Sequence, residues 1–169
     1  MKNYTLALMM VGALALTACD KNKQFETGPD ALNAGTTEIT PGSASDPNAP
    51  AYFQQTIGDR ILFAVDQSVL SPQAQELVAQ QAAWLMANPD YAAIIEGHAD
   101  EQGTTEYNIA LGARRASAVQ AYLIDRGVAP NRLKTVSYGK ERPLEICSDE
   151  TCYAKNRRAV TVLTAGGIS

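Results

Sequence analysis

The segment from residue 91 to residue 127 reads YAAIIEGHADEQGTTEYNIALGARRASAVQAYLIDRG, and it predicts a strand, a polar loop and a long helix. The strand spans Tyr91–His98, with two isoleucines at its centre. Thr104 or Thr105 caps the helix that follows. Gly127 ends this helix, because glycine adopts the left-handed conformation of a helix C-cap at little cost. The segment is therefore expected to form one strand–helix unit.

The flanking sequence supplies a second helix and three further strands. Ser71 and Pro72 form a good helix start, with serine at the N-cap and proline at the first helical position, and Asn88-Pro89 stops this helix. The further strands are expected at residues 60–65, 133–138 and 158–164, with a short helical turn at residues 153–156. The order strand–helix–strand–helix–strand–strand predicts an α/β fold of the α+β type, with helices packed on a four-stranded mixed sheet.

One charged residue falls on the apolar side of the helix that follows Thr105. At about 100° per residue, Arg115 lies between Leu111 and Val119 on one apolar arc, and Asn108 lies on the same side one heptad earlier. A guanidinium on the packed side of a helix is costly unless a carboxylate or phosphate meets it. We therefore expect an anionic group to reach Arg115.

Asp100 is the natural counterpart of Arg115. It follows the strand Tyr91–His98, at the C-terminal end where the loops of α/β sheets gather ligand groups. One interpretation is a buried salt bridge between the two residues. In the other, both charges face a zwitterionic ligand, whose ammonium binds the carboxylate and whose carboxylate receives a two-pronged contact from the guanidinium. The residues alone leave both interpretations open.

Residues 1–18 have the features of a secretory signal that ends at a cysteine. Lys2 supplies a positive start, residues 4–16 are apolar, and two small residues precede Cys19. Leu16-Thr17-Ala18-Cys19 resembles the lipobox of bacterial lipoproteins, in which the cysteine becomes an acylated N-terminus. A retained membrane anchor and a chance cysteine are the alternatives. We expect acyl chains on Cys19 to anchor the protein to a membrane.

Residues 19–51 are expected to form a flexible tether. From residue 20 to about residue 50, small and polar residues dominate with almost no apolar periodicity, so the segment cannot bury enough surface to offset chain entropy. Some thirty extended residues at about 3.3 Å each would span roughly 100 Å. That reach suits a domain, expected at residues 52–169, that must find something fixed beyond the membrane.

Four separated motifs resemble a known family. EGHADEQG at residues 96–103 and EYNIALGARRA at residues 106–116 are similar to the signature of the OmpA-like peptidoglycan-binding domain. VSYGKERP at residues 136–143 and NRRAV at residues 156–160 fit the peptidoglycan-associated lipoproteins within that family, as do the lipobox and the tether. The resemblance covers about residues 60–163.

The resemblance implies a ligand and a set of binding residues. In this family the residues at the positions of Asp100 and Arg115 bind diaminopimelate, a zwitterionic component of the peptidoglycan stem peptide. Asn108 and Leu111 match positions that line the same pocket, and Phe63 matches a segment that borders it. The resemblance also implies that the protein links the outer membrane to the cell wall from its periplasmic face. It further implies binding to TolB and a role with other Tol proteins in envelope constriction.

The chain departs from the family pattern at two positions. Where the family commonly has Phe-Asp-x-Asp, this chain has Phe63-Ala64-Val65-Asp66, so a polar side chain is missing at Ala64 and backbone amides are left to serve. Asp20 directly follows the cysteine of the lipobox and resembles a retention signal for the inner membrane of enteric bacteria. Sorting rules differ among bacterial groups, so we still expect the outer membrane.

The C-terminal part of the chain holds two further candidate pairs. Once Cys19 is acylated, Cys147 and Cys152 remain as a pair in an oxidising compartment, so we expect a disulfide. Free thiols are the alternative, because close spacing can strain the bond geometry. Arg157 and Arg158 form either a rim of the pocket or a solvated pair beside the last strand.

The composition argues against nucleic-acid, metal and catalytic chemistry. The formal net charge is −4, and no basic run suggests nucleic acid. His98 is the single histidine and no CxxC pair is present, so we expect no metal or cofactor and a hydrogen-bonded histidine instead. No spacing supports the carboxylate pair of a wall hydrolase, so we expect no enzyme. The alternative function is an envelope scaffold in which the Asp100–Arg115 pair is only structural.

Overall fold

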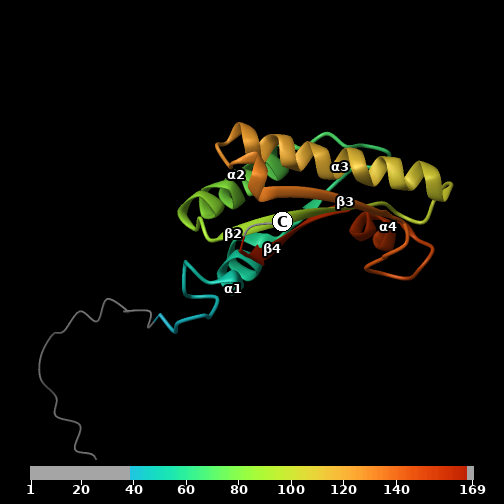
Figure 1. Cartoon of the computed structure of the whole chain (residues 1–169). Helices are drawn as coiled ribbons and strands as arrows, with labels where there is room; N and C mark the ends of the chain where they lie inside the picture. The colour runs from blue at the N-terminus through green and yellow to red at the C-terminus, as the bar shows by residue number, and fades with distance from the viewer. Residues whose placement is uncertain (1–38, 167–169) are drawn as a thin grey trace, which may run out of the picture. The chain divides into compact units, whose positions relative to one another are not determined.

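The computed structural model describes residues 39–166, which form a four-stranded sheet with the two long helices α2 and α3 packed on one face (Figure 1). The strands are β1 (Arg60–Leu62), β2 (Tyr91–His98), β3 (Leu133–Gly139) and β4 (Arg158–Ala165). The helices are α1 (Pro50–Tyr52), the π-helix η1 (Phe53–Gly58), α2 (Pro72–Ala87), α3 (Thr105–Asp125), the 3-10 helix η2 (Pro130–Arg132) and α4 (Glu150–Asn156).

The sheet is mixed, as the sequence predicts. Its strand order is β1-β4-β2-β3. β2 pairs in parallel with β3 and antiparallel with β4, and β4 pairs antiparallel with β1. The parallel pair needs a long crossover, and α3 supplies it. The predicted fold class is therefore confirmed, and β2 lies in the interior of the sheet with its C-terminal end next to the start of the α3 crossover.

Local capping signals set the ends of both long helices. Ser71 caps α2 by accepting a bond of 3.2 Å from the amide of Ala74. Thr104, and not Thr105, caps α3 by accepting a bond of 3.2 Å from the amide of Tyr107. At the other end of α3, Gly127 has a φ of 101°, and its amide and the next one donate to carbonyls of the last turn at 2.9 and 3.1 Å. This pair of hydrogen bonds defines a Schellman motif.

The first strand is shorter than the sequence predicts. β1 ends at Leu62, and only the amide of Phe63 makes one more bond across the sheet, to the Arg157 carbonyl at 2.9 Å. The chain then turns away, and Asp66 adopts a φ of 56°. The expected strand over residues 60–65 is therefore wrong after Leu62, because the carbonyls beyond it turn toward a buried side chain of α3 instead.

The core lies between the two long helices and the sheet, and the helix α3 approaches β2 very closely. The side chains at the centre of this core are fully buried: Val78, Leu85, Ile95, Val119 and Leu123. Burying each such side chain stabilises the fold by about 1.5–3 kcal/mol. A Cβ atom added to Gly97 of β2 would lie 1.8 Å from the carbonyl oxygen of Gly112 in α3. This contact fixes α3 directly above the end of β2, where the predicted site lies.

The packed region begins before Tyr52, the residue at which we predicted the domain to start. Ala49 is buried, and the indole Nε1 of Trp84 donates to the Pro47 carbonyl at 2.7 Å. Phe53 is fully buried, with its ring centroid 5.1 Å from that of Trp84. These contacts hold residues 47–53 against α2, so this part of the expected tether packs on the domain.

Residues 19–38 of the expected tether, together with the signal sequence, lie outside the described residues, and Cys19 is among them. Within residues 39–166, none of the helices combines the length and the apolar character that a membrane span requires.

Candidate functional site

A pocket of about 230 Å³ opens between the end of β2 and the first turns of α3. Its lining is Val65, Asp66, Asp100, Gln102, Gly103, Tyr107, Asn108 and Leu111. The set includes Asp100, Asn108 and Leu111, which the sequence singled out. Phe63 and Arg115 do not belong to the lining, and both are buried. The structure therefore brings part of the predicted site together around one pocket.

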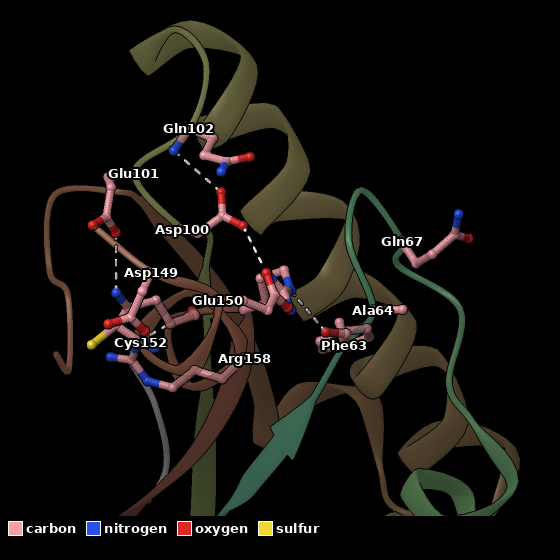
Figure 2. A network of polar contacts seen from close by, with 12 residues as sticks. Phe63, Ala64, Gln67, Asp100, Glu101, Gln102, Asp149, Glu150, Cys152 and Arg158 are labelled. Atoms are coloured by element: carbon pink, nitrogen blue, oxygen red, sulfur yellow. Dashed lines mark hydrogen bonds and ion pairs between the residues drawn. The ribbon is translucent and has the colours of Figure 1, made fainter. Parts of the chain in front are cut away.

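Asp100 is held at two points just after β2. Its Oδ1 accepts a hydrogen bond of 3.3 Å from the amide of Gln102, and its Oδ2 lies 3.2 Å from Nη1 of Arg157. Figure 2 shows the Asp100 carboxylate and its contact with Gln102. Each carboxylate oxygen accepts more than one hydrogen bond, so Asp100 keeps the capacity to bind a donor in the pocket.

Arg115 is the largest of the fully buried side chains in the described part of the chain. Its guanidinium donates to three backbone carbonyls, those of Gln67 at 2.8 Å, His98 at 2.8 Å and Ala64 at 3.2 Å. The premise that only a carboxylate or phosphate can satisfy this buried group was therefore wrong, whereas an anionic ligand near Arg115 stays a prediction. Backbone carbonyls are strong acceptors, and three of them satisfy a buried guanidinium without a counter-ion in contact.

The salt bridge between Asp100 and Arg115, one of the two interpretations that the sequence left open, is not formed. Within residues 39–166, the ion-pair partner of Asp100 is Arg157, the residue directly before β4. Burial lowers the pKa of Arg115 to about 10, and the negative charge of Asp100 partly opposes this effect. Arg115 is therefore still a cation at neutral pH, and Asp100 acts on it through the electric field and not through a direct bond.

Phe63 connects the two buried arginines. Its ring lies 5.3 Å from the guanidinium carbon of Arg115, which is a cation–π distance. Its carbonyl accepts a bond of 3.3 Å from Nε of Arg157. The missing polar side chain at Ala64 is a real departure from the family pattern, but the Ala64 carbonyl still takes part through Arg115. In this segment the backbone carries the polar contacts.

Asn108 shapes the loop that forms one wall of the pocket. Its side chain is 1% exposed, and its Nδ2 donates to the Gln102 carbonyl at 2.7 Å. Gly103, with a φ of 88°, allows the loop to turn at this point. Also in the lining, the Tyr107 hydroxyl donates to the carboxylate of Asp66, and this hydrogen bond raises the pKa of Tyr107. Sequence reasoning did not single out Asp66 or Tyr107, because nothing local to either residue indicates their contact.

Arg157 and Arg158 are both buried, so neither belongs to a solvated pair. Arg157 contacts Asp100 and also makes a two-pronged ion pair with Glu150, which raises the pKa of Arg157. Arg158 donates to the carbonyl of Arg142 at 3.1 Å and thereby holds the loop before α4. Of the two, Arg157 is the one that reaches the site.

A family model described as the OmpA family matches residues 62–157 of this chain. The chain belongs to the OmpA family. The resemblance found in the sequence is thereby confirmed, and it extends to full-length relatives and to solved structures.

The relatives of this OmpA-family chain include several proteins named peptidoglycan-associated lipoprotein. That of Mesorhizobium japonicum is 48% identical over 160 residues, which cover 95% of this chain and 92% of the relative. That of Brucella melitensis is 44% identical over 162 residues, covering 96% and 93%, and that of Haemophilus influenzae is 38% identical over 161 residues, covering 95% and 98%. These relatives are named as lipoproteins and not as enzymes, which agrees with our expectation for this chain.

Two solved structures show the same fold. The crystal structure of the peptidoglycan-associated lipoprotein from Burkholderia pseudomallei has a TM-score of 0.63 and 39% identity, and the match covers 70% of this chain and 97% of that one. The C-terminal domain of Helicobacter pylori MotB has a TM-score of 0.60 at 22% identity, covering 63% and 84%. The second likeness concerns the fold alone.

His98 occupies an unusual place in this OmpA-family domain. It is 2% exposed, and among the described residues neither ring nitrogen has a hydrogen-bond partner, so the expected hydrogen-bonded histidine was wrong. Its ring packs on that of Tyr138 with a centroid distance of 5.6 Å. Burial, followed by the positive charges of Arg158 and Arg142, lowers the pKa of His98 to about 4. The imidazole is therefore neutral at physiological pH.

Cys147 and Cys152 form a disulfide with a Cα–Cα distance of 5.9 Å, the pairing that the sequence predicted. Together with Asp149 they are the one group in residues 39–166 that has the spacing of a metal site. Because both sulfur atoms are bonded to each other, they do not offer the thiolates that a metal would need. The cluster is therefore a cross-link and not a metal centre.

Proposed function

We propose that this protein is a lipid-anchored envelope protein whose OmpA-family domain binds peptidoglycan non-covalently through diaminopimelate of the stem peptide. The observation that carries the proposal is a carboxylate in the lining of the pocket, that of Asp100, which interacts electrostatically with a buried cation outside the lining, Arg115. Asp100 lines the pocket, and the buried cation Arg115 donates to the His98 carbonyl, two residues before Asp100. A zwitterionic group is the ligand that such a pair of charges complements.

Diaminopimelate suits the pocket because its free end carries an ammonium and a carboxylate on one carbon. The carboxylates of Asp100 and Asp66 line the pocket and would accept from the ammonium. Each such charge-assisted bond contributes about 1.5–3 kcal/mol when it is partly desolvated. Arg115 is buried and does not line the pocket, so it would attract the ligand carboxylate through its electric field while it keeps its backbone contacts.

The relatives support the proposal through their names. Proteins that are 38–48% identical over nearly the whole chain are named peptidoglycan-associated lipoproteins. We extend this association to the present chain, with residues 1–18 as a signal, Cys19 as the acylated N-terminus and the segment after it as a tether. The protein would then sit on the periplasmic face of the outer membrane, with TolB and other Tol proteins as partners.

A pull-down on isolated sacculi tests wall binding directly. Asp100→Asn keeps the shape of the side chain but removes its charge, so we expect at least tenfold weaker binding, equivalent to about 1.4 kcal/mol. Asp125→Asn, an exposed acid at the far end of α3, is the matched control and should bind like the parent. If a folded Asp100→Asn variant pellets with sacculi as the parent does, the ligand site lies elsewhere.

A competition assay tests the ligand class. Free diaminopimelate should displace the protein from sacculi, whereas free cadaverine, which has both amines but no carboxylate, should not. Equal displacement by both compounds would show that Arg115 does not select a carboxylate.

Acylation is tested by mass spectrometry of the mature N-terminus. We expect a cleaved chain that begins at a lipid-modified Cys19, and Cys19→Ser should release the protein from membrane fractions. An unmodified Cys19 or cleavage at another residue would contradict the anchor.

A scaffold role without wall binding is the second candidate. The three carbonyl bonds of Arg115 favour it, because they explain the buried charge without any ligand. The sacculus pull-down separates the two functions, since a scaffold would not pellet with purified wall.

A further inference from the structure

We propose that α4 is a positioning element for the wall-binding pocket. In this arrangement the Cys147–Cys152 disulfide clamps the start of α4, Glu150 in its first turn holds Arg157, and Arg157 holds the Asp100 carboxylate. The inference rests on the proposed function of Asp100 and adds residues outside the pocket that control it.

Arg157 is placed to orient Asp100 and not to touch the ligand. Its side chain is 5% exposed and does not belong to the lining of the pocket. Its contact with Asp100 uses Oδ2, while the amide of Gln102 binds Oδ1, so the carboxylate cannot rotate without breaking one of these bonds. The direction in which Asp100 presents its free acceptor positions therefore depends on where Arg157 lies.

Glu150 fixes the position of Arg157. Both terminal nitrogens of Arg157 contact the Glu150 carboxylate, whereas its Nε binds the Phe63 carbonyl at 3.3 Å. The Glu150 side chain is 67% exposed. An exposed acid holds its partner in one place only where its own backbone is fixed, because otherwise the entropy of a free side chain opposes the pair.

The disulfide supplies that fixed backbone. α4 has seven residues, and a helix of this length is unstable in isolation. Asp149 caps it by accepting a bond of 3.2 Å from the amide of Cys152. The bond between Cys147 and Cys152 ties the loop before the helix to its first turn, the turn that carries Glu150. Opening this link would release the Asp149 cap and Glu150 together.

The link is open to chemical control. Cys147 is half-buried, so a small thiolate can attack it. A dithiol would transfer two electrons to the disulfide, giving two cysteine thiols, and would itself become a cyclic disulfide. Wall binding would then fall without any change in the residues that touch the ligand.

Binding to sacculi by matched variants tests the relay. Glu150→Gln should weaken binding about fivefold, equivalent to about 1 kcal/mol. Glu145→Gln is the control, because Glu145, in the loop before α4, pairs with Lys155 of α4 at 3.1 Å and makes neither a hydrogen bond nor an ion pair with Arg157 or Asp100. It should bind like the parent. Replacing both Cys147 and Cys152 by serine should weaken binding as Glu150→Gln does, and dithiol treatment should weaken the parent but not the serine variant.

Two further readouts separate positioning from general stability. In an Asp100→Asn background, Glu150→Gln should add no further loss, because the relay acts only through Asp100. Arg157→Lys, which keeps a charge beside Asp100, should retain more binding than Arg157→Gln. The unfolding midpoint of every variant is measured alongside, so that loss of folded protein is not counted as loss of binding.

The outcomes distinguish the two proposals. If the parent binds and Asp100→Asn fails, but Glu150→Gln and the serine variant bind like the parent, then α4 does not position Asp100 and the inference is overturned. Independent, additive effects of Glu150→Gln and Asp100→Asn would also overturn it. A parent that does not bind sacculi would overturn the proposed function, and this inference with it.

Discussion

The buried side chain of Arg115 connects segments that lie far apart in the sequence. Its charge lies in the core, and three backbone carbonyls satisfy it. Two of these, from Ala64 and Gln67, belong to the loop after β1, and the third belongs to His98 at the end of β2. The guanidinium therefore fixes the segments on both sides of the pocket, in addition to supplying a positive field.

We expect Arg115→Ala to destabilise the domain by about 3–5 kcal/mol, because it leaves buried carbonyls without donors and opens a cavity. Arg115→Lys should recover only part of this loss, since an ammonium cannot reach all three carbonyls in the same geometry. Urea unfolding measures both values. A loss of stability below about 1 kcal/mol for Arg115→Ala would show that these carbonyls accept hydrogen bonds from water once the guanidinium is removed.

His98 predicts a specific dependence of stability on pH. Its pKa is about 4 in the fold, below the ordinary value of 6.5. The unfolded chain therefore binds a proton that the folded domain does not bind between these two values. This contribution to stability is fully present above about pH 6.5 and is lost as the pH falls toward 4, by about 3 kcal/mol in all.

The variant His98→Leu removes this contribution. Among the described residues neither ring nitrogen makes a hydrogen bond, and the Glu96 carboxylate lies 3.6 Å from Nε2. Because no hydrogen bond is lost, leucine should be tolerated at pH 7. The stability difference between variant and parent, measured by urea unfolding, should then move in favour of leucine as the pH is lowered from 7 to 4. A constant difference across that range would contradict the low pKa of His98.

At the scale of elements, the close packing of α3 on β2 defines the place of the pocket. Gly97 and Gly112 face each other with no room for a side chain, since a Cβ atom on Gly112 would lie 2.4 Å from the Ser137 hydroxyl. Backbone atoms on both sides of the contact leave little room to relax. The helix N-terminus, with Asn108 and Leu111, is thereby held beside Asp100.

We expect Gly97→Ala to destabilise the domain by several kcal/mol, because the added methyl group would overlap the backbone of α3 and push the helix from the sheet. Ala110→Ser, which adds one atom on the exposed side of the same helix, is the control and should change stability by less than about 0.5 kcal/mol. Thermal unfolding compares the two. Wild-type stability for Gly97→Ala would mean that helix and strand separate easily.

At the scale of the whole molecule, the chain before β1 closes one end of the core. Residues 47–53 cover Trp84, whose indole nitrogen donates to the Pro47 carbonyl. The sheet, the two long helices and this segment thus form one packed unit. The domain is larger than the family match, which begins at residue 62.

A chain that begins at residue 52 should be less stable than one that begins at residue 40, by about 1–3 kcal/mol, because Trp84 loses its acceptor and its cover. Trp84 is the single tryptophan, so its fluorescence reports both the unfolding transition and the exposure of the indole before unfolding. Equal unfolding midpoints for the two chains would show that residues 40–51 do not stabilise the domain.

The sequence alone determined the four strands and the two long helices, and where most of them begin and end. It did not predict α1, η1 or η2, and α4 begins at Glu150, before the turn expected at residues 153–156. Ser71, Thr104 and Gly127 act within four residues of their own positions, and apolar periodicity reports which face of a strand or helix is buried. Such short-range effects depend little on the rest of the fold. For this reason the bounds of α2, β2 and α3 followed from local sequence, whereas the grouping of Asp100, Asn108 and Leu111 in one site was implied by the resemblance to the family.

Only the tertiary structure decided which charges meet. Arg115 binds carbonyls that lie 17, 48 and 51 residues away in the chain, and Asp100 pairs with Arg157, 57 residues away. The sequence indicated that a buried guanidinium needs acceptors. Every residue has a backbone carbonyl, so the sequence does not indicate which carbonyls accept from Arg115. Which of them turn inward depends on the point where β1 ends and on the close approach of α3 to β2, and these are set by packing across the whole core.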